Sequence, residues 1–462
     1  MGAAMGDRVE RLAGIVARAQ RLVEIEEPRY RQRTAGSFAA TRQASALMPM
    51  GLPASGQAFG SSALVAAHAA GAYLDDIDGN HYLDFNMGYG ALLVGHGHPV
   101  VMDAVRRQLE QGTVYLMPCV DNVTVARALV ARFGQPMWRF TNSGTESTMP
   151  AIRAARSFTG RDRIVKTEGA YHGQYDSVLV SMKPSLAEAG TDSNPVPVPS
   201  STGIPAAYLS CTTVVAFNDL ASLGRELEEG DVACVIIEPA LQNIGIVMPD
   251  AGYLAGVREL CDATGTLLIF DEVKIGITAH WGGATTLFGV RPDLVCVSKS
   301  IGGGLPLGAF GGRADVMDEV RPGRVTHVGT FSGNPLAMAA AVATLDSVCT
   351  PEATATVIER ANRLADGCES VIGSYRLPAH VVRMGARGCI TWRSQPARNY
   401  RETLDVHTAI AKAQWLWCIN RGILLPPGLD SQWLVSVQHT DRDIDDTIAV
   451  FAEFAAAVVL AE

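Results

Sequence analysis

Short, continuously apolar stretches alternate with helical stretches through the middle of the chain. MWRFTNS (137–143) precedes the helical GTESTMPAIRAARSF, VACVIIEP (232–239) precedes GYLAGVRELCDATG, and LLIFDEV and DLVCVSKS follow further on. Apolar runs of this length, separated by helices of ten or more residues, are typical of parallel strands covered on both faces. The pattern therefore predicts an α/β fold around a mostly parallel sheet flanked by helices.

The N-terminal part has a different pattern. The stretch up to Ser37 has the composition of a charged helix followed by a loop, and the Ala-, Met-, Pro- and Gly-rich stretch from Phe38 to Gln57 favours an irregular segment. In GAYLDDIDGNHYLDF (71–85), apolar and polar residues alternate around DGN, which indicates a hairpin.

The pattern also marks one long loop and divides the chain into three parts. Pro184–Thr202 is the longest predicted loop, and loops of this length inside a domain are often functional lids. The helical PLAMAAAVATLDSV (335–348) ends the run of sheet units. We expect an N-terminal segment, a large domain and a smaller C-terminal α/β domain, over residues 1–95, 96–335 and 336–462.

Composition and charge exclude several classes of function. Lys and Arg number 38 against 47 Asp and Glu, so the formal net charge is −9. Without a basic block, such a chain is a poor candidate for binding nucleic acid or an anionic membrane, although a local pocket can still take a small anion. The nine cysteines are scattered without a CxxC pair, and no apolar stretch indicates a signal peptide or a membrane span. We therefore expect a cytoplasmic protein.

Chemistry in a parallel α/β sheet is expected where strands end at their carboxyl side. TNSGTEST (141–148) lies between a strand and a helix, where hydroxyls, exposed amides and the helix dipole suit a phosphate. The alternative is helix capping, because Asn, Ser and Thr all cap helices. VGTFSGNP (328–335) has a similar character, and its Thr330 is a further candidate phosphate ligand or turn residue.

Asp271 and Lys299 each follow a buried apolar strand. A buried carboxylate at Asp271 needs a partner, which could be a metal, a helix cap or a protonated ring nitrogen; no accompanying set of ligands favours a metal. Lys299, ahead of three glycines, points its amine into a crevice, where a desolvated lysine can form a Schiff base; the alternative is a lysine paired with an acid. Together with phosphate-binding hydroxyls, this pair predicts pyridoxal 5′-phosphate as the cofactor.

These motifs resemble those of the class III pyridoxal-phosphate aminotransferases of fold-type I, and most of all the glutamate-1-semialdehyde 2,1-aminomutase branch. The resemblance runs from about residue 71 to residue 445 and is carried by GHGHP, NSGTEST, RIVKTEGAYHG, IIEPALQNIG, FDEV, SKSIGGGLPLGAFGGR and GTFSGNPLAMAAA. It implies a large cofactor-binding domain, a smaller C-terminal α/β domain and a homodimer with shared sites. It also implies that His96 and His98 of GHGHP belong to a structural turn.

The resemblance implies a role for each candidate residue. Lys299 would carry the Schiff base and move a proton, and Asp271 would keep the ring nitrogen protonated. The other implied cofactor contacts are Ser143, Gly144 and Thr145 at the phosphate, Tyr171 and Val273 on the two ring faces, His172 beside Tyr171, Glu238 and Asn243 near the phenolic oxygen, and Thr330 at the phosphate of the neighbouring subunit.

Two arginines are candidates for binding a substrate carboxylate, because a guanidinium pairs with it through two hydrogen bonds. Arg42 in ATRQAS is similar to an N-terminal arginine with this role in the family. Arg387 in GARGC is the second candidate, with a strand-surface arginine as the alternative. The stretch FDEVKIGIT departs from the family, with Lys274 and Ile275 where members more often have Met-Thr.

The resemblance leaves two reactions open. We expect an aminotransferase of specialised metabolism that moves an amino group from a small-molecule donor to a keto or aldehyde acceptor by a ping-pong mechanism. The alternative is intramolecular transfer of the aminomutase type, which the similarity of PVPVPSSTGIP to a gating loop favours. A third possibility, a homologue that binds the cofactor without catalysis, is disfavoured because Lys299 and Asp271 are both present.

Overall fold

A seven-stranded sheet forms the centre of the computed structural model, which describes residues 2–58, 64–428 and 430–460. The strands lie in the order β4 (Met137–Thr141), β12 (Gly308–Gly312), β11 (Leu294–Ser298), β10 (Leu267–Asp271), β9 (Val232–Ile237), β5 (Arg163–Thr167) and β8 (Thr212–Val215). All neighbours pair in parallel except β12, which is antiparallel to both β11 and β4. The predicted α/β fold with a mostly parallel sheet is confirmed.

Helices cover both faces of this sheet because successive strand residues point to opposite faces. On one face, strand residues such as Ile236 and Ile269 join a core with α6 (Gly144–Thr159) and α12 (Ala314–Met317). On the other face, Val235 and Phe270 pack with α8 (Leu220–Leu227) and α9 (Tyr253–Thr264). Further helices continue this layer past β11 and β4: α4 (Pro99–Leu109), α5 (Val120–Phe133), α11 (Gly283–Phe288) and α13 (Pro335–Val342).

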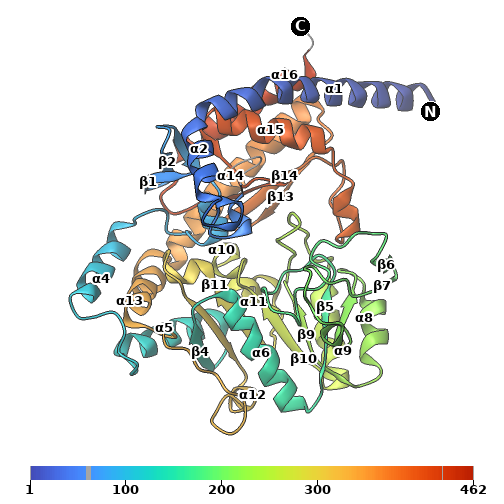
Figure 1. The fold of residues 1–462 in the computed structure, drawn as a ribbon. Coiled ribbons are helices and arrows are strands. Elements are labelled where there is room, and N and C mark those ends of the chain that lie inside the picture. Colours follow the sequence, from blue (N-terminus) through green and yellow to red (C-terminus); the bar gives the residue numbers. More distant parts are fainter. Residues whose placement is uncertain (1, 59–63, 429, 461–462) are drawn as a thin grey trace.

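A second body lies above the carboxyl ends of the central strands (Figure 1). It contains a sheet of β1 (Ala66–Ala70), β2 (Tyr73–Asp76), β3 (His81–Asp84) and β15 (Ile423–Leu424), and another of β13 (His380–Met384), β14 (Arg387–Thr391) and β16 (Asp430–Leu434). The predicted hairpin is the β2–β3 pair. The helices α14 (Pro351–Tyr375), α15 (Thr408–Asn420) and α16 (Asp441–Val459) complete this body.

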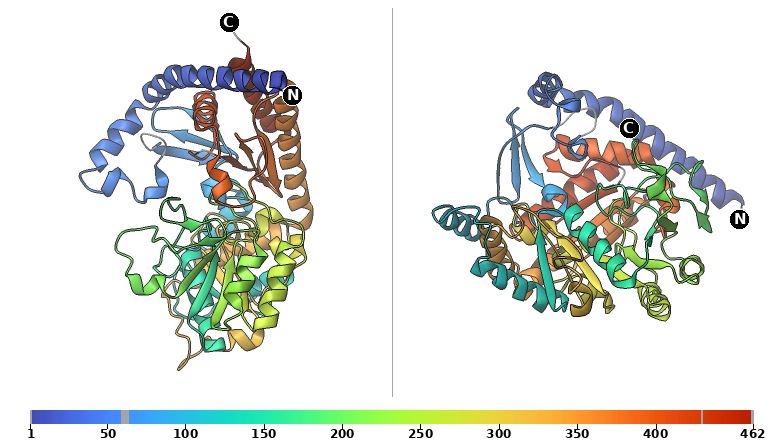
Figure 2. Two further views of the ribbon diagram at one scale, coloured as in Figure 1. Left: turned by 90° about the vertical axis from the view of Figure 1, so that its right-hand side faces the viewer. Right: turned by 60° about the horizontal axis from the view of Figure 1, so that its bottom comes forward.

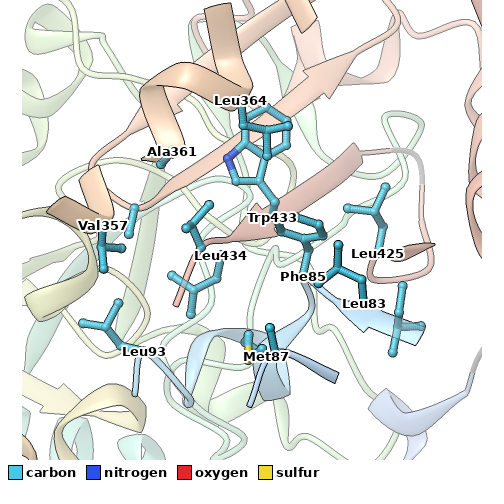
Figure 3. Close-up of a cluster of buried hydrophobic side chains, with 14 of the residues drawn as sticks. Leu83, Phe85, Met87, Leu93, Val357, Ala361, Leu364, Leu425, Trp433 and Leu434 are labelled. Carbon is cyan, nitrogen blue, oxygen red and sulfur yellow. The ribbon is translucent and has the colours of Figure 1, made fainter. Parts of the chain in front are cut away.

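The two ends of the chain share this second body. The long helix α1 (Gly2–Arg33) packs on α15 and α16, as Figure 2 shows from two further sides. Residues of the β3 region, such as Leu83 and Phe85, lie in one buried cluster with Trp433 and Leu434 of β16 (Figure 3). Apolar burial therefore joins the N-terminal segment to the C-terminal part.

Two predicted irregular stretches contain regular structure. The segment predicted as irregular from Phe38 begins as the helix α2 (Ala35–Ala44), and only the residues beyond it form short turns, with 3₁₀ helices at Pro49–Gly51 and Ser55–Gln57. The stretch Ala35–Ala44 has four Ala and no Pro, which suits a helix, and the Pro residues follow later. In the predicted lid, two short strands, β6 (Gly190–Thr191) and β7 (Asn194–Pro195), form a small antiparallel pair.

His96 of the GHGHP turn is paired with the buried carboxylate of Asp84. His96 Nε2 lies 2.8 Å from Asp84 Oδ2, and the other carboxylate oxygen of Asp84 accepts hydrogen bonds from the amides of Asn86 and Met87. Among the described residues, no group of three or more His, Cys, Asp or Glu side chains is placed to hold a metal ion. Within the same residues, no helix is long and apolar enough to cross a membrane.

Candidate active site

Five central strands deliver side chains to one cavity at their carboxyl ends. Ser143 follows β4, Tyr171 follows β5, Glu238 follows β9, Asp271 ends β10 and Lys299 follows β11. All five line a cavity of about 390 Å³. The carboxyl edge of a parallel sheet is where such folds bind ligands, so the sheet itself brings these distant residues together.

A buried histidine and a buried aspartate that line this site are paired with each other. His172 Nδ1 lies 2.7 Å from Asp271 Oδ2, while Asp271 Oδ1 accepts a hydrogen bond from the Val273 amide. The backbone carbonyl of His172 accepts a hydrogen bond from Thr148 Oγ1 at 2.6 Å, which fixes the loop that carries it. Each Asp271 oxygen therefore has a partner, as the cost of burying a carboxylate requires.

The ring of His172 retains one unpaired polar atom. Its Nε2 is buried and has no hydrogen-bond partner among the described residues. A buried polar group without a partner is costly, and such groups concentrate where ligands bind.

Lys299 stands in a strained backbone conformation beside these residues. Its φ is 51°, in the left-handed region that residues other than glycine seldom adopt. Desolvation lowers the pKa of its amine; Asp271 and Glu238 oppose this, and the guanidinium of Arg387 adds to it. A lowered pKa increases the fraction of neutral amine, which is the form that attacks a carbonyl.

The loop between β4 and α6, which is the predicted phosphate site, lines the cavity. Ser143 Oγ accepts a hydrogen bond from the Glu146 amide, so Ser143 caps α6 as well as lining the cavity. A Cβ at Gly144 would lie 2.5 Å from a methyl group of Val273, so only glycine lets this loop approach Val273. Thr145 lines the same wall. Exposed amides at the start of a helix of this length suit an anion.

Glu238 organises the opposite wall. Its carboxylate accepts hydrogen bonds from the Tyr171 amide at 2.9 Å and from Asn243 Nδ2 at 3.0 Å, and also from the Gln242 amide. Desolvation raises the pKa of Glu238, and it raises that of the Tyr171 phenol as well. Glu238 thereby fixes the backbone that carries Tyr171 and the side chain of Asn243.

A second cavity of about 470 Å³ shares Tyr171, Asn243, Lys274 and Lys299 with the first. Its other end contains Arg387, which the sequence left as either a substrate ligand or a strand-surface residue. The surface interpretation is wrong, because the residue is only 3% exposed. Its Nε donates to Thr278 Oγ1, and no acidic partner pairs with it in the described part of the chain. Burial lowers the pKa of Arg387 to about 10.

Arg42 and Thr330 lie outside both of these cavities. Arg42 is exposed on α2 and does not line either cavity. Thr330 is exposed and lines a different cavity of about 510 Å³, together with residues 114–118 and Gly333. The other predicted cofactor contacts, Ser143, Gly144, Thr145, Tyr171, His172, Glu238, Asn243, Asp271, Val273 and Lys299, all line the first cavity.

Several lining residues were not predicted as ligands. Leu305, Pro306 and Leu307 line the first cavity, and Lys183, Gln242 and Trp433 line the second. Leu305, Pro306 and Leu307 follow directly after the three glycines behind Lys299, which is the one local feature that places them near the site. No local pattern marked Trp433, which comes to the site through the β14–β16 pairing.

The fold and this site define a fold-type I enzyme that uses pyridoxal 5′-phosphate. A model of the class-III aminotransferase family matches residues 56–428, and the chain belongs to that family. The predicted family and the predicted cofactor are therefore confirmed.

Relatives and solved structures agree with this assignment. The glutamate-1-semialdehyde 2,1-aminomutase of Syntrophobacter fumaroxidans is 42% identical over 398 residues, which cover 85% of this chain and 90% of that one. The structure of a glutamate-1-semialdehyde aminomutase from Pseudomonas aeruginosa has a TM-score of 0.86 and 31% identity, covering 96% of this chain and 99% of that one. An omega-transaminase from Sphaerobacter thermophilus has a TM-score of 0.85 and 33% identity, covering 91% and 97%.

The residues of the first cavity fit the cofactor. The unpaired Nε2 of His172 leaves a place for a group that the described part of the chain does not supply. When bound, the cofactor supplies an aldehyde that links to amines and a ring that draws electrons from the adjoining carbon. In this cavity Lys299 would supply the amine, Asp271 would supply a carboxylate for a ring nitrogen, and Ser143 and Thr145 would supply hydroxyls for a phosphate.

Proposed function

We propose that this enzyme moves an amino group between carbon atoms of small, carboxylate-bearing molecules, within one substrate molecule in the manner of the glutamate-1-semialdehyde 2,1-aminomutases. The main observation behind this proposal is that Lys299, Asp271 and His172 line one cavity, where His172 and Asp271 are paired. The relatives named above support the intramolecular mode. The sequence favoured intermolecular transfer, and that mode is the second candidate.

The residues that line the second cavity support intermolecular transfer. It combines Arg387 with Lys274, at a stretch where this chain departs from the family pattern. A changed substrate wall indicates a changed substrate, because specificity depends on the groups that line the pocket. Under this candidate, an amino donor and a keto or aldehyde acceptor would occupy the cavity in turn.

Donor dependence distinguishes the two modes. The enzyme loaded with the amino form of the cofactor is mixed with glutamate-1-semialdehyde or with separate keto acids, without an added amine. Intramolecular transfer predicts repeated turnover of the semialdehyde under these conditions, measured as 5-aminolevulinate. Turnover that stops after one equivalent and resumes only with an added amino donor would exclude the mutase mode.

Arg387 is proposed to bind the substrate carboxylate. It is buried without an acidic partner and lies close enough to Lys299 to lower the pKa of that amine. We expect Arg387→Met to raise KM for carboxylate substrates about 10- to 100-fold, the range of charge-assisted hydrogen bonds, with a smaller change in kcat. The cofactor's visible absorbance and the Tm serve as checks on folding. The matched variant is Arg42→Ala; a KM increase for Arg42→Ala and none for Arg387→Met would reverse the assignment.

We propose a homodimer whose partner covers the cavity around Thr330. Exposed apolar side chains gather beside that cavity: Leu116 (80% exposed), Met117 (72%), Val120 (81%), Val328 (85%) and Phe331 (58%). An apolar patch of this kind is typical of an interface between subunits. Sedimentation velocity at micromolar concentration tests this proposal, and a monomer would contradict it.

A further inference from the structure

A fully buried lysine lies outside both cavities, next to the residues that line the first. Lys166, on β5, is 0% exposed and lines neither cavity. Lysine is seldom buried to this extent without a specific partner, because its amine must be removed from water. Desolvation lowers the pKa of this amine to about 7, although the nearby carboxylates of Glu238 and Glu168 act in the opposite direction. The position of Lys166 therefore calls for an explanation from its contacts.

The Lys166 amine closes the loop of residues 168–181, which we call the Tyr171 loop. Its Nζ donates to the backbone carbonyl of Ala170 at 2.9 Å and to that of Val180. These two carbonyls stand near the two ends of the loop, so one side chain joins the segment that enters the loop to the segment that leaves it. A lysine amine has the two N–H donors that these bonds need whether it is charged or neutral.

The peptide group before Tyr171 is held at both of its polar atoms. Its oxygen is the Ala170 carbonyl, which accepts the hydrogen bond from Lys166. Its N–H is that of Tyr171, which donates to Glu238 Oε1 at 2.9 Å. The two side chains come from neighbouring parallel strands, because Lys166 on β5 pairs with Ile236 on β9, two residues before Glu238. A peptide group is planar, so holding both of its ends fixes the direction in which the chain enters Tyr171. We call Lys166 and Glu238 together the peptide clamp.

We propose that Lys166 is a positioning residue: with Glu238 it holds the peptide before Tyr171 and keeps the Tyr171 loop ready for the cofactor. His172 follows directly and pairs with Asp271, so a shift of this peptide would disturb that pair as well as the Tyr171 ring. A loop that is already in its binding conformation raises the apparent affinity for a ligand, because no binding energy is used to order it. The inference rests on the cofactor contacts predicted for Tyr171 and His172, and it holds for either mode of amino-group transfer.

Lys166→Met tests the peptide clamp, because methionine is similarly long and unbranched but has no N–H donor. Without the clamp, only part of the population keeps a binding-competent loop, so we expect the dissociation constant for pyridoxal 5′-phosphate to rise about 10-fold. The visible circular dichroism of the bound cofactor should also weaken, because this signal reports how the surroundings hold the ring. Lys412→Met is the matched control, since Lys412 belongs to an exposed ion pair with Glu27.

A second control separates positioning from stability. Leu364→Ala removes buried volume from α14 in the core of the second body and lowers the Tm at a distance from the Tyr171 loop. We expect it to leave cofactor affinity and visible circular dichroism close to those of the wild type. Equal losses of affinity in Leu364→Ala and Lys166→Met, at a comparable loss of Tm, would overturn the inference. Wild-type affinity and circular dichroism in Lys166→Met would overturn it as well.

Hydrogen exchange in the wild type needs no variant and decides the question if Lys166→Met does not fold. The peptide clamp predicts that the amides of residues 169–181, that of Tyr171 above all, are already protected in the cofactor-free enzyme. Rapid exchange of these amides, with protection only after loading with pyridoxal 5′-phosphate, would overturn the inference. A wild type that meets these expectations but transfers no amino group would sink the proposed function and leave the peptide clamp standing.

Discussion

Lys299→Ala is expected to reduce amino-group transfer on the order of 10⁴-fold or more, as removal of a covalent nucleophile does in other enzymes. The amine of Lys299 combines a lowered pKa with a position beside Asp271, and its left-handed backbone conformation aims it at the cavity. Alanine removes the amine without adding bulk. The predicted phosphate ligands Ser143 and Thr145 are unchanged in this variant, so the cofactor should still bind, but without a covalent link.

Borohydride reduction followed by peptide mapping gives a direct readout of that link. In the wild type, the cofactor's mass should be found on the peptide that contains Lys299, and in Lys299→Ala it should be absent after denaturation. Lys274 is the internal control, because it is a second amine on the wall of the same cavity. A reduced adduct on Lys274, or full activity in Lys299→Ala, would show that Lys299 is not the nucleophile.

Asp271 and Lys299 were predictable because their signals are local. Each stands at the end of a continuous apolar run, and such a run predicts a buried parallel strand whose carboxyl end opens on a ligand site. The structure bears out this logic, since β10 and β11 are neighbours and pair in parallel. The family resemblance then supplied the other predicted cofactor contacts that line the first cavity, although not Leu305, Pro306 or Leu307.

The burial of Arg387 was not predictable from GARGC. The residue lies on β14, in a sheet separate from the central one, and the turn at Gly90 covers its guanidinium: a Cβ there would lie 1.5 Å from Nη2. Gly90 and Arg387 are almost 300 residues apart in the chain, so no local sequence pattern could indicate that they are in contact. The antiparallel strand β12 was equally hidden, because GAFGG has too many glycines for a strand signal.

Asp271→Asn is expected to reduce kcat about 10²- to 10³-fold, the range for removing one preorganised electrostatic partner from an active site. The asparagine is nearly isosteric and can keep the hydrogen bond from the Val273 amide, but it loses the negative charge that would stabilise a protonated ring nitrogen. His172, 2.7 Å away, loses its anionic partner at the same time. Substrate binding should change little, because Arg387 stands at the far end of the second cavity.

The split between kcat and KM separates this electrostatic role from a structural one. Asp271→Glu keeps the charge but shifts it along the side chain, so it should recover part of kcat, whereas Asp271→Asn should not. His172→Gln disturbs the same pair from the other side, and if Asp271 acts on the ring nitrogen itself, the histidine change should cost less than the aspartate change. If Asp271→Asn instead raised KM and lowered Tm with kcat intact, the carboxylate would serve to hold the His172 loop, and the charge at the ring would have to come from another group.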